Sequence, residues 1–112
     1  MSKHTATTRD MDTHELKTEQ PFFNRIAGLK KTCEVRKLDR DFKVGDKLIL
    51  KEYNPKDTYY PYSGNQIEVI VTDILTHEQF EGVQPGWCVM SFNQDEMKRN
   101  FIYESDPWKT FP

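Results

Sequence analysis

The segment from Gln66 to Leu75 constrains the fold of this chain more than any other. It is rich in β-branched residues, and its alternating side chains are apolar on both faces, with Val69 and Val71 on one face and Ile70 on the other. A strand that is apolar on both faces belongs in the middle of a sheet or in a barrel. The sequence therefore predicts a fold built around a central strand.

Further strands are expected on both sides of this segment. Period-two alternation and flanking turn residues predict strands at 13–18, 32–37, 47–53 and 87–92. The segment 54–65 holds two prolines, three tyrosines and Ser63-Gly64-Asn65, which are typical of a long hairpin loop. A second loop is expected at 76–86.

One helix is expected between the first two strands. Pro21 is suited to the first turn of a helix, Gly28 is a natural terminator, and Phe22, Phe23 and Ile26 form an apolar stripe. The expected core joins Phe22 or Phe23 and Ile26 to one residue from each of three strands: Val35, Ile49 and Val89.

With 112 residues, the chain is expected to form one α+β domain, a small mixed barrel of five or six strands, because closure removes exposed sheet edges. We expect residues 1–12 to be disordered, residues 13–92 to form the domain, and residues 93–112 to form a tail. Asn93 and Glu96 have the spacing of a helix cap, which predicts a short helix through about Tyr103. The apolar end of the tail is expected to dock on the domain or on a partner protein.

Composition and spacing exclude several classes of protein. No run of eighteen apolar residues and no apolar leader is present, so the expectation is a cytoplasmic protein without a membrane partner. Cys33 and Cys88 lie far apart in strand-like runs and are expected to be buried thiols. The three histidines are scattered, so neither a metal site nor a cofactor is predicted.

The net charge of −2 conceals a strong asymmetry. Residues 25–51 contain nine Lys or Arg against four acids, whereas residues 57–97 contain seven acids and no Lys or Arg. The two segments could neutralise each other within one sheet. Alternatively, the basic segment could form a face that attracts a phosphate-bearing ligand.

The strand 32–37 carries the most distinctive polar pattern. Thr32, Glu34 and Arg36 share one face, while Cys33 and Val35 share the other, apolar face. An acid and a guanidinium two residues apart can donate to and accept from a polar ligand. The alternative is a solvated strand face with a weak ion pair.

Several motifs, in this order and spacing, resemble the ASCH-like domains of the PUA superfamily. They are His14-Glu15-Leu16-Lys17, Gly28 with Lys31 to Lys37, Arg40 to Asp46, Tyr62-Ser63-Gly64 and Pro85-Gly86-Trp87. The resemblance covers residues 14–92 and is closest to a branch of small bacterial and phage proteins of unknown function. It implies a small barrel with a polar cleft beside the first helix, and RNA or nucleotide binding.

One branch of that superfamily is an amidohydrolase that deacylates a modified cytidine with a Lys, a Thr and a Glu. Lys31 matches its lysine, but its threonine falls on Glu34 here, and Thr32 is one position away from the required spacing. Its glutamate has no assigned counterpart in this sequence. The glycine usual before the lysine pair is replaced by Leu29.

The candidate site follows from these patterns and from the resemblance. Lys31 and Glu34 are the candidates for catalysis, and the candidates for ligand binding are Lys17, Thr32, Arg36, Lys37, Arg40, Tyr53 and Trp87. Each has a structural alternative, such as a solvated lysine, an ion pair or a core aromatic residue. Three functions remain open: an RNA- or nucleotide-binding module, an amidohydrolase acting on an N4-acylated cytidine, and a phage-type protein-interaction module.

Overall fold

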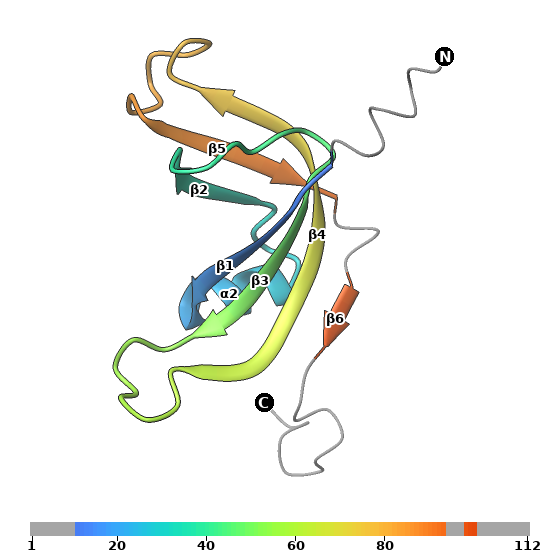
Figure 1. Cartoon of the computed structure of the whole chain (residues 1–112), viewed down its shortest axis with the longest axis vertical. Helices are drawn as coiled ribbons and strands as arrows, with labels where there is room; N and C mark the ends of the chain where they lie inside the picture. Colours follow the sequence, from blue (N-terminus) through green and yellow to red (C-terminus); the bar gives the residue numbers. More distant parts are fainter. Residues whose placement is uncertain (1–10, 94–97, 101–112) are drawn as a thin grey trace.

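A single long strand, β4 (Tyr62–Thr76), organises the fold, and the first half of β4 pairs with β3 (Lys47–Tyr53) while the second half pairs with β5 (Trp87–Phe92). A register shift between Val71 and Asp73 lies where the partner changes. In the computed structural model, which describes residues 11–93 and 98–100, this strand runs through both halves of the sheet (Figure 1). The central position expected for Gln66–Leu75 is therefore confirmed.

Two edge strands complete the main sheet, whose order is β1-β3-β4-β5-β2. Strand β1 (Thr13–Glu19) runs parallel to β3, and β2 (Cys33–Lys37) runs antiparallel to β5. The short strand β6 (Lys98–Asn100) pairs with β4 at Gln66–Glu68, outside this order. The mixed pairing and the strand count agree with the α+β class that the sequence predicted.

The expected barrel is wrong, because the sheet does not close between β1 and β2. Among the described residues, these two strands make no backbone ladder with each other. The Arg36 side chain instead crosses from β2 and donates from Nη2 to the carbonyl oxygen of Lys17 on β1, 2.5 Å away. Side chains therefore span the opening where a barrel would have paired strands.

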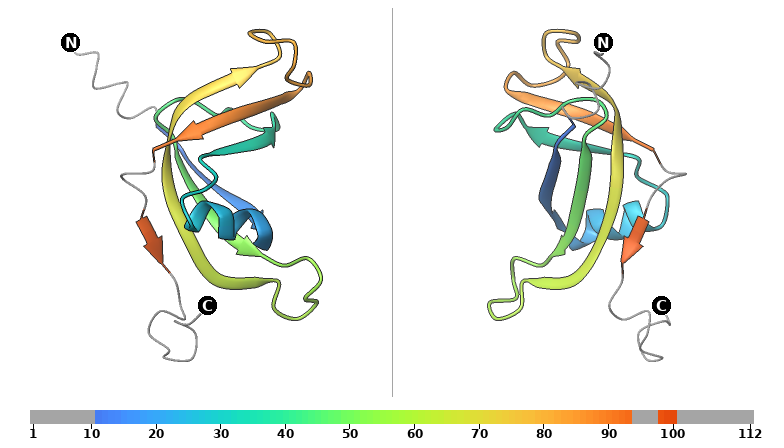
Figure 2. Two further views of the ribbon diagram at one scale, coloured as in Figure 1. Left: turned by 180° about the vertical axis from the view of Figure 1, so that it is seen from behind. Right: turned by 45° about the vertical axis from the view of Figure 1, so that its right-hand side comes forward.

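The helix α2 (Gln20–Ala27) lies on the concave side of the sheet (Figure 2). Phe23 and Ile26 are buried against the inner faces of the strands, whereas Phe22 is 44% exposed. Pro21 occupies the first turn, as its fixed φ favours. Of the two candidates for the core, the structure therefore selects Phe23.

The helix ends in a Schellman turn whose left-handed residue is Leu29. The amides of Leu29 and Lys30 donate to the carbonyl oxygens of Ile26 and Arg25, at 3.0 and 2.8 Å. Leu29 has a φ of +62°, whereas Gly28 has a φ of −85°. Gly28 therefore marks the helix end as expected, but the left-handed position that favours glycine holds a leucine.

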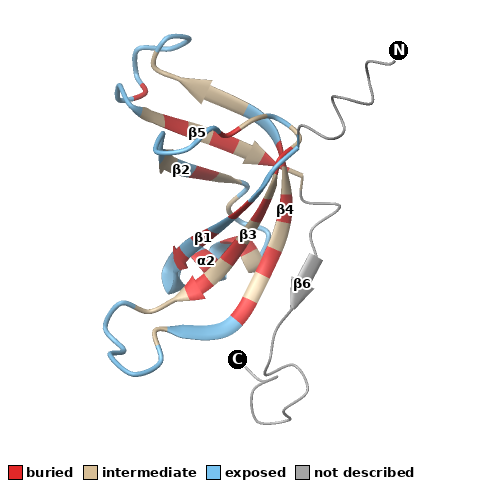
Figure 3. Ribbon diagram, viewed as in Figure 1, coloured by how far each residue is buried: buried red, intermediate tan, exposed pale blue. Residues whose placement is uncertain are grey.

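The inner faces of three strands differ from the prediction. Val35 is 56% exposed, so its expected place in the core is wrong, and Ile49 and Val89 are half-buried on the outer face. The core consists of the alternate residues, and burial alternates along β3, β4 and β5 (Figure 3). These core residues are Leu48, Leu50, Ile67, Val69, Met90 and Cys88 together with Leu16, Phe42, Val71 and Phe92.

The two ends of the chain fall only partly within the described residues. Residues 98–100 form a strand, so the helix expected to run through them is wrong there, and the other tail residues beyond Asn93 lie outside the description. Of the expected disordered segment, residues 11 and 12 are described, and the Asp12 amide donates to Asp46. Within the described residues, no helix has both the length and the apolarity needed to cross a lipid bilayer.

Candidate functional site: a cleft between the edge strands

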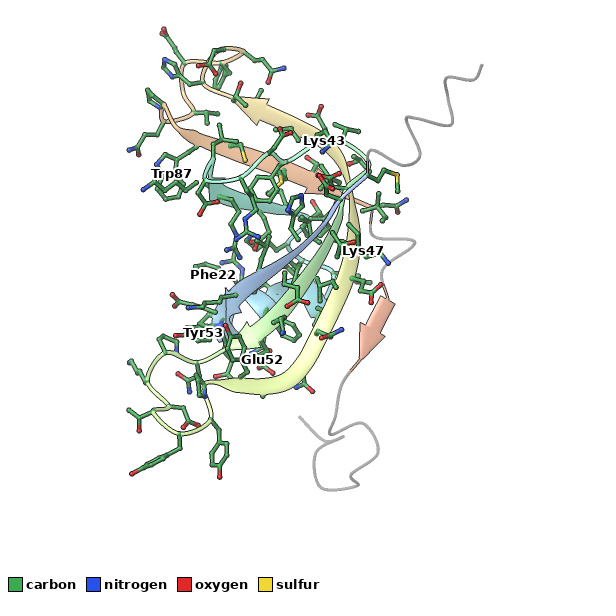
Figure 4. All side chains as sticks on the ribbon, viewed as in Figure 1. Phe22, Lys43, Lys47, Glu52, Tyr53 and Trp87 are labelled. Atoms are coloured by element: carbon green, nitrogen blue, oxygen red, sulfur yellow. The ribbon has the colours of Figure 1, made fainter. Side chains whose placement is uncertain are left out.

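A cleft of about 290 Å³ opens between the edges of β1 and β2. Its walls combine basic, acidic and aromatic side chains from β1, α2, β2 and the segment that follows β2. The lining residues include Lys17, Thr18, Phe22, Glu34, Arg36, Lys37, Arg40, Phe42 and Trp87. In Figure 4, Trp87, Phe22 and Tyr53 lie along one flank of the molecule.

Glu34 stands between two cations on the inner face of β2. Lys31 Nζ lies 2.9 Å from Glu34 Oε1, and Arg36 Nη2 lies 2.9 Å from Glu34 Oε2. The Glu34 side chain is 6% exposed, against 16% for Lys31 and 25% for Arg36. The carboxylate is thus buried with both oxygens paired, and the two cations extend from it toward solvent.

Two arginines cap the free edge of β1. Arg36 donates to the carbonyl oxygen of Lys17, and Arg40 Nη1 lies 3.4 Å from the carbonyl oxygen of Glu15. Carbonyl groups two residues apart on a strand point to the same edge. The guanidinium groups therefore take the place that a neighbouring strand would fill, and they are held in defined positions beside the cleft.

The structure brings some of the predicted residues together and separates others. Arg36, Glu34, Lys37, Arg40 and Trp87 all line the cleft. Lys31 contacts Glu34, and its Nζ also donates to the Cys33 carbonyl oxygen, but Lys31 itself is outside the cleft lining.

The remaining predicted residues lie at the periphery. Lys17 contributes its backbone to the cleft, while its ammonium group lies 5.0 Å from the centre of the Tyr53 ring on the outer face. Tyr53 is outside the cleft lining, and Thr32 is exposed just before β2. Lys17 is therefore joined to Arg36 by its carbonyl group, not by its charge.

Thr18 is a cleft residue that the sequence did not reveal. Its side chain faces inward with Leu16, is 1% exposed, and its Oγ1 lies 3.4 Å from Arg36 Nη2. The alternation of β1 carried the signal, because Leu16 and Thr18 must share a face.

A second buried carboxylate, Glu52, lies on the inner face of β3. Its oxygens accept hydrogen bonds from the side chains of Gln20, Ser63 and Asn65 at 3.0, 2.6 and 2.8 Å. All three donors are neutral, and they join the start of α2 to the start of β4. Glu52 is outside the cleft lining, so its role is to connect elements of the fold.

Asp12, His14 and Asp46 form the one group among the described residues with spacing suited to a metal ion. Asp46 accepts from the backbone amides of Asp12 and Lys43 at 2.9 Å each, and His14 Nε2 lies 2.8 Å from it. Burial acts to raise the pKa of the Asp46 carboxyl, but these hydrogen bonds outweigh it and lower the pKa below its ordinary value. Because N–H groups already surround Asp46, the cluster is best explained as a structural anchor for the start of β1.

The two cysteines are free thiols, with Cys88 buried and Cys33 half-buried, so the expectation of two buried thiols holds for Cys88 alone. Burial raises the pKa of the Cys88 thiol, and a backbone hydrogen bond from Arg36 only partly opposes this. A protonated, buried thiol is a poor nucleophile. Cys88 is therefore a core residue.

The fold and the cleft together define a small α+β domain with an open sheet and a cleft between its edge strands that is lined by charged and aromatic side chains. The chain belongs to the family described as "Domain of unknown function (DUF3850)", whose model matches residues 13–92. It is also similar to an "Uncharacterized 12.9 kDa protein in GpA 3'region" of Escherichia phage P2, with 34% identity over 61 residues. That match covers 54% of this chain and 52% of the phage protein, so the chain spans about half the length of this relative. The expected kinship with small phage proteins of unknown function is confirmed, and the relation to ASCH-like domains stays a prediction.

Proposed function

We propose that this protein binds RNA or a nucleotide in the cleft between β1 and β2. The observation that carries the proposal is the composition of the cleft wall, where Arg36, Lys37 and Arg40 stand beside Trp87 and Phe22. Basic groups bind phosphate, and aromatic faces stack on bases. The cleft offers both kinds of contact within one space.

The size of the cleft limits what can enter it. A volume of about 290 Å³ lies just below the usual range of ligand pockets, about 300–1,000 Å³. This suits one nucleotide unit better than a folded or double-stranded nucleic acid. We therefore propose recognition of a single nucleotide or of one residue within a flexible single strand.

The chemistry of the wall also predicts how the ligand is oriented. Glu34 accepts from two cations, so Arg36 can present its remaining N–H groups to a base edge or a phosphate. Lys37 and Arg40 are exposed at the mouth, where a phosphate would keep part of its hydration. The base then lies on the Trp87 side of the cleft.

Chemical-shift mapping with nucleosides, nucleotides and short RNAs tests this proposal. The first residues perturbed should be those of the cleft wall, and dissociation constants in the micromolar range or weaker are expected from so few charges. Lys37→Gln and Arg36→Ala should weaken binding, and Trp87→Leu should weaken it by about fivefold or more through lost stacking. Lys30→Gln is the matched control, because Lys30 is also exposed near β2 but is outside the cleft lining.

A second candidate function, hydrolysis of an N4-acylated cytidine, rests on the contact of 2.9 Å between Lys31 and Glu34. We rank it below binding because both oxygens of Glu34 are paired and Lys31 is outside the cleft lining. The purified protein is therefore expected to leave such a nucleoside intact. Turnover by the wild-type chain that is lost in Lys31→Ala and Glu34→Gln would reverse the ranking.

A further inference from the structure

A second hollow, of about 270 Å³, lies beside the cleft along the edge of β1. It shares Leu16, Lys17, Arg36 and Arg40 with the cleft, so the two spaces adjoin each other across these residues. The rest of its lining is Glu15, Lys51 and Tyr62. The sequence did not single out this hollow, because its residues come from four separate segments of the chain.

Positive charge dominates the hollow. Four of its seven lining residues, Lys17, Arg36, Arg40 and Lys51, are cations, and Glu15 is the single acid among them. Glu15 is exposed and accepts from Lys51 at 3.3 Å. An exposed ion pair of this kind contributes little to stability and can exchange its partner at low cost.

The two guanidinium groups are already positioned for a ligand. Arg36 donates to the carbonyl oxygen of Lys17 and to Glu34, which fixes its side chain at the junction of the cleft and the hollow, and Arg40 Nη1 lies beside it, 3.4 Å from the carbonyl oxygen of Glu15. Side chains that are ordered before binding lose less conformational entropy when the ligand arrives. A phosphate group is the ligand that best suits paired guanidinium groups flanked by lysines.

Aromatic rings continue the surface beyond the hollow. The Lys17 and Lys51 ammonium groups lie 5.0 and 5.5 Å from the ring centres of Tyr53 and Tyr62, and these two rings are 5.1 Å apart. The hairpin that joins β3 to β4 begins at this point and exposes Tyr59. Cationic groups interleaved with aromatic rings are typical of surfaces that bind single-stranded nucleic acid.

We infer that the hollow is a phosphate subsite for single-stranded nucleic acid. The strand places one base in the cleft and the adjoining phosphate between Arg36, Arg40 and Lys51. It then runs toward Tyr53 and Tyr62. This inference rests on the proposed function and deepens it, because it makes the ligand a strand with a backbone and not a lone nucleoside.

Lys51 provides the sharpest test, because it lines the hollow but not the cleft. Lys47 is the matched control: it lies on the same face of β3, has similar exposure, and forms one ion pair with Glu68 at 3.5 Å. It is on the opposite side of the molecule from Trp87, Phe22 and Tyr53 (Figure 4). Lys51→Gln and Lys47→Gln therefore remove equal charge at two positions of one strand.

The experiment measures the binding of a labelled hexauridylate and of uridine to the wild-type chain and to both variants over a range of salt concentrations. Lys51→Gln should weaken hexauridylate binding roughly three- to tenfold at low salt and reduce the log–log salt slope by about 0.7, the value for one phosphate of a single strand. Uridine binding should not change, and Lys47→Gln should match the wild type with both ligands.

Two results would overturn the inference in distinguishable ways. Equal hexauridylate affinities for the wild type, Lys51→Gln and Lys47→Gln would reject the phosphate subsite and leave the proposed function intact. A wild-type chain that binds neither uridine nor hexauridylate would reject both.

Discussion

Two buried glutamates, Glu34 and Glu52, have nearly the same exposure, 5% and 4%, and very different surroundings. Glu34 is paired with two cations at the opening between β1 and β2, whereas Glu52 accepts from three neutral side chains between β3, the start of α2 and the start of β4. Burial is therefore not what distinguishes a candidate site in this protein. The distinction lies in the donors, because cations that reach toward solvent can also bind a ligand, whereas neutral donors inside the fold only stabilise it.

The largest expected effect is on stability, at Glu52. Glu52→Leu should lower the free energy of unfolding by about 2–4 kcal/mol, because it removes the acceptor shared by three side-chain donors. Glu34→Leu should lower the free energy of unfolding by less, about 1–3 kcal/mol, because water at the cleft can solvate the Lys31 and Arg36 charges that lose their partner. Urea unfolding measures both, with the exposed Glu78→Leu as the control. A larger loss of stability in Glu34→Leu than in Glu52→Leu would contradict the view that the neutral donors around Glu52 depend more on their acceptor.

Asp46 extends the comparison to a carboxylate held mainly by backbone amides. Asp46→Asn should destabilise the protein by about 1–3 kcal/mol at neutral pH. Because the folded pKa of Asp46 lies below its ordinary value of 3.8, its contribution is complete above that pH and is lost as the pH falls through the folded value. The stability difference between wild type and variant should therefore shrink below about pH 3.8. A difference that stays constant down to pH 2 would show that the carboxylate charge is not involved.

The smallest effect concerns Leu29, whose turn places Lys31 beside Glu34. A leucine with a φ of +62° is strained, so Leu29→Gly should raise the free energy of unfolding by about 0.5–1 kcal/mol. Leu38→Gly is the control, since Leu38 is also exposed but does not have a positive φ, and it should be destabilising. Thermal unfolding measures both, and a loss of stability in Leu29→Gly would mean that side-chain contacts of Leu29 outweigh the strain.

The sequence by itself determined the elements of the fold. Strand alternation, the Pro21 and Gly28 signals and the turn residues are local, and they gave β1, α2, β2, β3 and β5 to within one residue at either end. Two predictions were less accurate: β4 begins at Tyr62, four residues before the expected Gln66, and the strand β6 forms where a helix was predicted. Pairing with Tyr53 extends β4 into a segment whose composition predicted a loop.

The sequence also holds information about which faces of β3 and β5 are buried, in the residues that share a face with Ile49 and Val89. Ile49 shares its face with Lys47 and Lys51, which indicates that Leu48 and Leu50 point inward. In the same way, Val89 shares its face with Trp87 and Ser91, leaving Cys88 and Met90 for the core. Choosing one side of a strand requires weighing all of its residues, not only its most apolar one.

Only the tertiary structure decided that the polar face of β2 points inward. Alternation separates Val35 from Glu34 and Arg36 but does not say which side is covered, because burial depends on the neighbouring strands. Val35 lies on the outer face opposite Val89, while Glu34 enters the interior because Lys31 and Arg36 neutralise it there. Strands β1 and β2 are not paired with each other, and the Arg36 side chain spans the opening between them. The cleft lies in this opening. Local sequence sets which residues can form a strand, but long-range packing sets which of its faces meets the core.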